Sequence, residues 1–196
     1  MQYYIYSLVC FLLPGTVWLI WNKGMIADKA YKVRHIIWIY IYLFYGYLAV
    51  QEAAGIGTIW DLIAYGKLDN SINLIPFSSE GAMTYILNII MFMPLGFLLP
   101  LIWKNFRNAK KVVLMGFLMS LAIEICQLFN IRTTDIDDLM MNTLGAVIGY
   151  FIWKLTKRLF KNINHKSISL SKLEPIVYLT LAVLGEFLLF NWRIFL

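Results

Sequence analysis

Residues 82–103 read AMTYILNIIMFMPLGFLLPLIW and contain no charged side chain. Because a helix rises about 1.5 Å per residue, a segment of this length is long enough to cross the roughly 30 Å hydrocarbon core of a bilayer. A soluble fold would have to bury the segment on all sides. The stretch therefore predicts a transmembrane helix, and it decides the class of fold.

Five more windows of similar length are apolar and poor in charge. The six windows are 3–21, 36–54, 82–103, 112–130, 139–157 and 175–192. The chain is 61% hydrophobic and only 14% charged, whereas soluble domains are roughly 45–50% apolar and about 25% charged. We predict an all-α fold, a polytopic helical membrane bundle of about six transmembrane helices. No Lys or Arg precedes the first window and no small-residue cleavage pattern follows it, so we expect this helix to be retained.

The basic residues indicate how the helices are oriented. Of the 17 Lys and Arg residues, 14 lie in three alternate segments: after the first window, after the third, and from the end of the fifth onward. Cytoplasmic loops carry the excess of basic residues. We therefore predict a multi-pass protein of the cell membrane with both termini extracytoplasmic. This arrangement places His35 and His165 on the cytoplasmic side, where we expect solvated loop residues.

The net charge of +6 and the two cysteines have simple explanations. The basic residues lie beside the helices, where they set topology and contact anionic membrane lipids, so we expect no nucleic-acid partner. Cys10 and Cys126 each fall inside an apolar window, and we expect them to be buried small hydrophobes. The two cysteines do not form the sequence pattern of a disulfide framework or of a metal site.

Two loops are predicted to be extracytoplasmic, at about 55–81 and 131–138. In the first, residues 58–65 have the pattern of a short amphipathic helix lying at the interface. The following stretch, Asn73 to Phe77 (NLIPF), is expected to be extended or turning because of its proline. The second loop is short, so it ties the two adjoining helices into a tight antiparallel hairpin.

Polar residues gather at this hairpin. Glu124 and Gln127 are three positions apart and share one helix face. Asp135, Asp138 and Asn142 share a face of the next helix, which we expect to turn toward that pair. Asn88 lies about a turn and a half into the segment 82–103. The candidate site consists of Asn88, Glu124, Gln127, Arg132, Asp135, Asp138 and Asn142.

Two interpretations of this set follow from the residues. An ionisable group at membrane depth costs at least about 2.5–3.5 kcal/mol, and such groups usually pair or mark functional positions. In the structural interpretation, Glu124, Arg132 and one aspartate form a closed ion-pair network, and the other aspartates cap the following helix. In the functional interpretation, the set is a binding site, because a single arginine does not neutralise four carboxylates.

Three further features lie near the candidate site. Glu52 and Glu186, near the outer ends of their helices, either join the set or keep their carboxylates in interfacial water. Pro94 and Gly96 predict a kink or close packing in the helix that carries Asn88.

Four elements together resemble the VanZ family of membrane proteins, which are associated with teicoplanin resistance in Gram-positive bacteria. They are Asn73–Phe77 (NLIPF), Asn88–Gly96 (NIIMFMPLG), Glu124–Gln127 (EICQ) and Thr134–Gly145 (TDIDDLMMNTLG). The resemblance covers roughly residues 36–190. Residues 1–35 look like an additional N-terminal transmembrane helix and cytoplasmic loop, followed by a VanZ-like membrane domain at 36–196.

The resemblance implies that the protein lowers the susceptibility of the cell to teicoplanin and other lipoglycopeptide antibiotics. It also implies that the protein acts at the cell surface. The first hypothesis is that the extracytoplasmic polar site binds a cell-wall precursor, a lipid headgroup or the glycopeptide itself. Arg132 would contact an anionic group, and the amides would fix the orientation of the ligand.

The alternative is a membrane-embedded enzyme that modifies a lipid or polyprenyl-linked envelope substrate. In that case Asp135, Asp138 and Glu124 are the candidate ligands for Mg²⁺, which prefers carboxylate oxygens and bridges to phosphates. We infer no other cofactor. A transporter is less favoured because the sequence shows no convincing internal repeat. The sequence also fits a scaffold for other envelope proteins. It fits a monomer and an oligomer equally.

Overall fold

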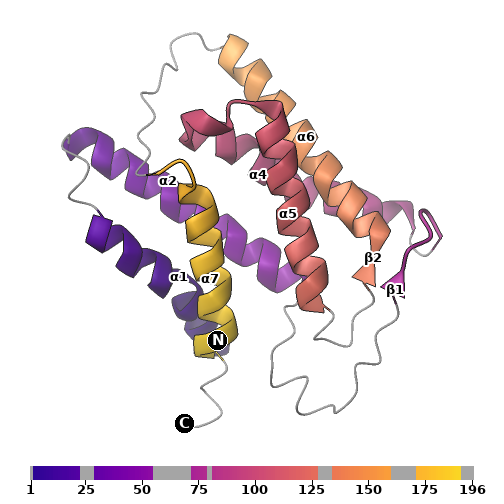
Figure 1. Ribbon diagram of the computed structural model, residues 1–196, viewed down its shortest axis with the longest axis horizontal. Coiled ribbons are helices and arrows are strands. Elements are labelled where there is room, and N and C mark those ends of the chain that lie inside the picture. The colour runs from indigo at the N-terminus through magenta and orange to yellow at the C-terminus, as the bar shows by residue number, and fades with distance from the viewer. Residues whose placement is uncertain are drawn as a thin grey trace.

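The computed structural model describes residues 2–22, 29–54, 72–78, 81–127, 134–159 and 171–190. This part of the chain is mainly α-helical: α1 Gln2–Asn22, α2 Lys29–Leu48, α4 Ala82–Ile102, α5 Ala109–Gln127, α6 Ile136–Leu159 and α7 Glu174–Leu189 (Figure 1). A π-helix, η2 (Ala49–Ala54), continues α2, and a 3₁₀ turn, η3 (Lys104–Phe106), follows α4. The two-residue strands β1 (Ile72–Asn73) and β2 (Thr134–Asp135) pair with each other. Each predicted window coincides with a helix, so the all-α prediction is confirmed.

Within the described residues, three helices are long and apolar enough to cross a membrane. They cover Tyr4–Asn22, Lys32–Gln51 and Ala82–Ile102. The outer faces of the first two carry exposed apolar stripes: Val9, Leu13, Val17 and Ile20 on α1, and Ile37, Ile41, Phe44 and Leu48 on α2. In water such stripes would be unfavourable, whereas in a bilayer they contact lipid. The structure thus has the apolar exterior of a membrane protein.

Glycines allow α4 and α6 to pack closely. A Cβ atom on Gly96 would lie 2.0 Å from the carbonyl oxygen of Ala146, and one on Gly149 would lie 2.0 Å from that of Met93. A Cβ on Gly145 would lie 2.3 Å from the carbonyl oxygen of Ile89. The close packing predicted at Gly96 is therefore confirmed, and it follows the small-residue rule for helices in membranes.

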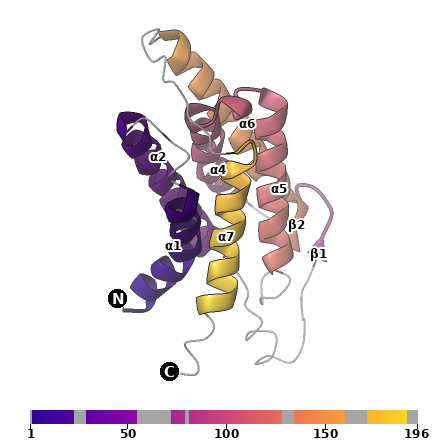
Figure 2. The same cartoon turned by 60° about the vertical axis from the view of Figure 1, so that its left-hand side comes forward.

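The helices form two groups joined by α2. Helices α4, α5 and α6 pack together, and α1 lies against α7 (Figure 2). A Cβ on Gly185 would lie 2.3 Å from the carbonyl oxygen of Cys10, so α1 and α7 also meet at a glycine. The hydroxyl of Tyr45 on α2 donates to the carbonyl of Met91 on α4, at 3.0 Å. The ring of Tyr42 on α2 also packs edge-on against Trp103, with 4.9 Å between the ring centroids, so aromatic side chains join α2 to the end of α4.

Contacts fix the direction in which the helices run. His35 in α2 contacts Glu174 at the start of α7, whereas Gln51 in η2 contacts Glu186 near the end of α7. Trp103, which follows α4, also contacts Glu174. Helices α2, α5 and α7 therefore start at one end of the bundle, which we call the histidine end. They run toward the other, which we call the hairpin end because α5 and α6 are joined there.

Candidate functional site at the hairpin end

Asp135 joins three segments at the hairpin end. The parallel strand pair places Asn73 opposite Asp135, and the Asn73 amide donates to Asp135 Oδ2 at 2.9 Å. The backbone N–H of Asp135 donates to Glu124 Oε2 at 3.1 Å. Asp135 Oδ1 accepts the backbone N–H of Asp137 at 2.9 Å, so the side chain caps the first turn of α6. The predicted capping role of an aspartate is confirmed here.

Asp137 anchors the NLIPF segment and is fully buried. Both of its carboxylate oxygens accept the backbone N–H of Phe77, at 2.9 Å. The hydroxyl of Tyr85 donates to Asp137 Oδ2 at 2.8 Å. Phe77 has a positive φ of 60°, an uncommon conformation for a large side chain. The turn is therefore held in an unusual shape by a buried carboxylate that our site prediction omitted.

Asp138 and Asn142 connect α6 to two different helices. The Asn88 amide on α4 donates to Asp138 Oδ1. The Asn142 amide donates to Ser120 Oγ on α5 at 2.9 Å, and both side chains are buried. The predicted common face is thus divided: Asn142 turns toward α5, Asp138 turns toward α4, and the Asp135 carboxylate binds Asn73 and the start of α6. Asn88 and Asp138 therefore meet, and the role of Asn88 in a binding site stays a prediction.

Glu124 and Gln127 are buried at the end of α5, each with only 4% of its surface exposed. Glu124 also anchors the hairpin through its backbone, because the Thr134 hydroxyl donates to its carbonyl oxygen at 3.3 Å. The predicted partner Arg132 lies outside the described residues, as do the amphipathic segment 58–65 and His165. The ion-pair network proposed for Glu124 and Arg132 therefore stays a prediction.

We refer to the polar residues that meet here as the hairpin cluster. Its described members are Asn73, Tyr85, Asn88, Ser120, Glu124, Gln127, Asp135, Asp137, Asp138 and Asn142. Within the described ranges, no group of three His, Cys, Asp or Glu side chains is placed to hold one metal ion. The cluster can donate through its amides and accept through its carboxylates, which suits recognition of a polar ligand group.

A second buried polar group lies between α1, η2 and α7. Glu186 is only 3% exposed, and its Oε1 accepts the Ser7 hydroxyl at 2.8 Å and the Gln51 amide at 2.6 Å. The expectation that this carboxylate lies in interfacial water is wrong. The neighbouring residues explain the difference, because Ser7 and Gln51 supply donors inside the bundle. The side chain of Glu52 is not among those described.

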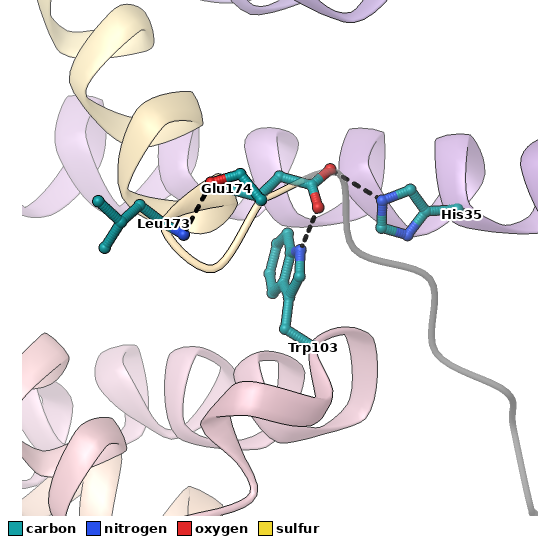
Figure 3. Close-up of polar contacts among 5 residues, drawn as sticks. His35, Trp103, Leu173 and Glu174 are labelled. Atoms are coloured by element: carbon teal, nitrogen blue, oxygen red, sulfur yellow. Dashed lines mark hydrogen bonds and ion pairs between the residues drawn. The ribbon is translucent and has the colours of Figure 1, made fainter. Parts of the chain in front are cut away.

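His35 is also placed differently from our prediction. It is only 6% exposed, and its Nε2 lies 2.8 Å from Glu174 Oε1 (Figure 3). The Trp103 indole N–H donates to Glu174 Oε2 at 2.9 Å. The prediction of a solvated loop histidine is wrong because α2 begins at Lys29, so His35 lies inside the helix and faces a buried carboxylate. This contact joins α2, α4 and α7 at the histidine end.

Comparisons with known proteins agree on one family. A family model described as VanZ/LLP1 matches residues 6–160, from within α1 to just beyond α6. A curated relative, Protein VanZ of Enterococcus faecium, is 32% identical over 109 residues, which make up 55% of this chain and 65% of the relative. The alignment thus spans less than two thirds of the length of that relative. No solved structure matches the chain.

Proposed function

The chain belongs to the VanZ/LLP1 family, and we propose that it is a multi-pass cell-membrane protein that lowers susceptibility to teicoplanin and related lipoglycopeptides. It would do so through the hairpin cluster, which binds a polar part of a cell-envelope molecule or of the drug. The observation that carries this proposal is the convergence of polar side chains from α4, α5, α6 and β1 at the hairpin end of the bundle.

We further propose six transmembrane spans with the hairpin end outside the cell. The distribution of charge supports this orientation. At the histidine end the described chain carries Lys104, Arg107, Lys110, Lys111, Lys157 and Arg158. At the hairpin end the described side chains include Glu124, Asp135, Asp137, Asp138 and Glu186. Because cytoplasmic ends carry the excess of Lys and Arg, the histidine end fits the cytoplasmic side.

In this proposal the residues of the cluster have different tasks. Asp135 and Asp137 hold the NLIPF segment and the start of α6 in place, so they position the site. Arg132 would contact an anionic group of the ligand as a charge-assisted donor. The amides of Gln127 and Asn88, together with Asp138, would orient the neighbouring polar groups. Buried polar groups at this depth are costly, which favours a functional reason for so many of them.

The experiment is a susceptibility assay in a sensitive Gram-positive host. The host expresses the wild-type protein or the variants Glu124→Gln, Arg132→Ala and Asp138→Asn at matched membrane abundance, and is challenged with teicoplanin and with vancomycin. We expect the wild type to raise the inhibitory concentration of teicoplanin, and each variant to lose most of that protection. Glu174→Gln is the matched control, because it alters a buried carboxylate at the opposite end of the bundle.

The control separates a binding site from a structural one. Glu174→Gln should retain protection when its folded abundance matches the wild type. If all three hairpin variants protect as well as the wild type, the hairpin cluster serves only to hold the fold together. If the wild type gives no protection at all, the proposed resistance activity is wrong.

A further inference from the structure

The NLIPF turn, Asn73–Phe77 after β1, points its apolar side chains outward. Three of them are highly exposed: Leu74 at 69%, Ile75 at 68% and Phe77 at 64%. The polar side chains bind inward instead. The Asn73 amide donates to Asp135, and the Ser78 hydroxyl donates to the carbonyl of Ile75 at 2.7 Å. Because turns in water are usually rich in exposed polar residues, the outward face of this turn is unlike that of a solvated loop.

Hydrogen bonds hold the turn in one shape. The Asn73 side chain accepts the backbone N–H of Ile75 and the hydroxyl of Ser78, each at 3.1 Å. Asp137 binds the backbone N–H of Phe77, where φ is 60°. A large residue keeps a positive φ only where its surroundings hold it there, and such strain is often functional. The turn therefore presents its exposed apolar side chains in a fixed arrangement.

The turn lies over the exposed apolar face of α6. Figure 1 and Figure 2 both show it at the edge of the bundle, next to β2 and the start of α6. Asp137, which binds the turn, shares one face of α6 with four apolar residues further along the helix. Their side chains are exposed: Met140 at 39%, Leu144 at 42%, Phe151 at 55% and Leu155 at 56%. The turn therefore extends this apolar face toward the hairpin end.

The contact between Phe77 and Tyr85 is of the kind found at a membrane surface. The two rings pack edge-on with 6.0 Å between their centroids, and the Tyr85 hydroxyl donates to Asp137. Tyrosine is enriched at the boundary between lipid and water because its ring is apolar and its hydroxyl is polar. An apolar face that continues along a membrane helix contacts lipid. Both features favour lipid as the partner of the turn.

We propose that the NLIPF turn binds the lipid surface of the bilayer, in the interfacial layer between the headgroups and the hydrocarbon core. The inference rests on the proposed function, in which α6 crosses the membrane. The interfacial layer contains water, so the turn stays within reach of water-soluble reagents while Ile75 and Phe77 contact acyl chains. Because Asp135 and Asp137 bind the turn, this contact holds the hairpin cluster at the level of the lipid headgroups.

The test measures the depth of spin labels in the full-length protein by electron paramagnetic resonance. The protein is placed in nanodiscs of phosphatidylcholine and phosphatidylglycerol, with Cys10 and Cys126 replaced by alanine. Single labels are attached in Ile75→Cys and Phe77→Cys. For each label, collisions with oxygen, which enters lipid, are compared with collisions with nickel ethylenediaminediacetate, which stays in water.

Two reference labels define the scale of depth. Leu144→Cys lies on the apolar face of α6, and Lys104→Cys is exposed at the histidine end. We expect the ratio of oxygen to nickel collisions at positions 75 and 77 to exceed that at position 104 about threefold, as for a side chain in the interfacial layer. The ratio at position 144 should be higher still. If Phe77→Cys does not fold, the label at position 75 decides the question.

A pair of variants tests whether Asp137 fixes the turn. Asp137→Asn removes the charged acceptor of the Phe77 N–H and should shift the spectrum of the label at position 75 toward faster motion. Asp138→Asn is the matched control, because Asp138 binds Asn88 on α4 instead of the turn. An unchanged spectrum in Asp137→Asn would refute a turn held at a fixed depth by this carboxylate.

The remaining outcomes separate the inference from the proposed function. A lipid-like ratio at position 144 together with water-like ratios at 75 and 77 would reject the inference and leave the span of α6 standing. A water-like ratio at position 144 would reject the proposed span itself. Dipolar broadening at position 75 that disappears on dilution with unlabelled protein would show that a second copy covers the turn, and would also overturn the inference.

Discussion

Asp137 is stabilised in a buried position by neutral donors. The backbone N–H of Phe77 and the hydroxyl of Tyr85 bind its carboxylate, and its place in the first turn of α6 adds the favourable field of a helix N-terminus. Buried carboxylates are costly unless their hydrogen bonds are made. The geometry therefore makes Asp137, together with Asn73, a residue that holds the shape of the NLIPF turn.

Replacing Asp137 should weaken the fold measurably. Asp137→Ala removes the carboxylate that accepts from the Phe77 N–H and the Tyr85 hydroxyl, and a hydrogen bond to a charged group contributes about 1.5–3 kcal/mol. We expect the free energy of unfolding to fall by at least about 2 kcal/mol, measured by thermal or denaturant unfolding in detergent. Tyr85→Phe removes one donor and keeps the acceptor, so its effect should be clearly smaller. Equal stability of Asp137→Ala and the wild type would contradict this role.

Helical spacing predicted only part of the arrangement of the cluster. It placed Asp135, Asp138 and Asn142 on one face, whereas the structure turns Asn142 toward α5, Asp138 toward α4 and the Asp135 carboxylate toward Asn73. Asp137 binds a backbone N–H and a tyrosine that are far away in sequence, and helical spacing carries no information about such partners. One signal was available, since the NLIPF segment had to satisfy its backbone N–H groups somewhere.

At the scale of elements, the contact between α4 and α6 depends on three glycines. Gly96, Gly145 and Gly149 each bring a backbone carbonyl of the other helix within 2.3 Å of where a Cβ atom would lie. Neither helix can move away cheaply, because the hydrogen bonds from Asn88 to Asp138 and from Asn142 to Ser120 hold α6 against α4 and α5. The glycine contact thus also sets the spacing of the hairpin cluster.

Gly149→Ala tests this contact. The added methyl group would lie 2.0 Å from the carbonyl oxygen of Met93, and overpacking of this kind costs about 1–3 kcal/mol. That exceeds the ~0.8–1 kcal/mol by which alanine is favoured over glycine within a helix, so we expect a lower unfolding temperature. Gly81→Ala is the matched control, because a Cβ there meets nothing within 4 Å. A Gly149→Ala protein as stable as that control would refute close packing at this position.

The helices were predictable as elements, whereas the strand pair was not. Hydropathy marks each helix because every window is apolar around most of its circumference. The pairing of Ile72–Asn73 with Thr134–Asp135 joins two loops, and two residues are too few to show the alternation of a strand. Its consequence is large, since it brings the NLIPF segment onto the start of α6.

At the scale of the whole molecule, the positions of the buried acids were the least predictable feature. Glu174 and Glu186 lie at opposite ends of α7, and each is bound by residues of helices distant in sequence: His35 and Trp103 for the first, Ser7 and Gln51 for the second. Hydropathy places Glu174 just before the last apolar window and Glu186 inside it, and it gives no information on the partner of either acid. Only the packing of α1, α2 and α7 shows that both are interior.

The measurement that tests the central claim most directly is the side of the membrane on which the hairpin cluster lies. Leu74 in the NLIPF segment is 69% exposed and stands beside Asn73, a member of the hairpin cluster. Lys104 is exposed at the histidine end. In Leu74→Cys and Lys104→Cys, reaction with a membrane-impermeant maleimide is measured on intact and on permeabilised cells, with the wild type as the background for Cys10 and Cys126.

We predict that the cysteine at position 74 reacts in intact cells and that the one at position 104 reacts only after permeabilisation. This outcome would place the hairpin cluster where an envelope molecule or an antibiotic arrives. Reaction at position 104 in intact cells, with position 74 protected until permeabilisation, would put the cluster in the cytoplasm and contradict the account.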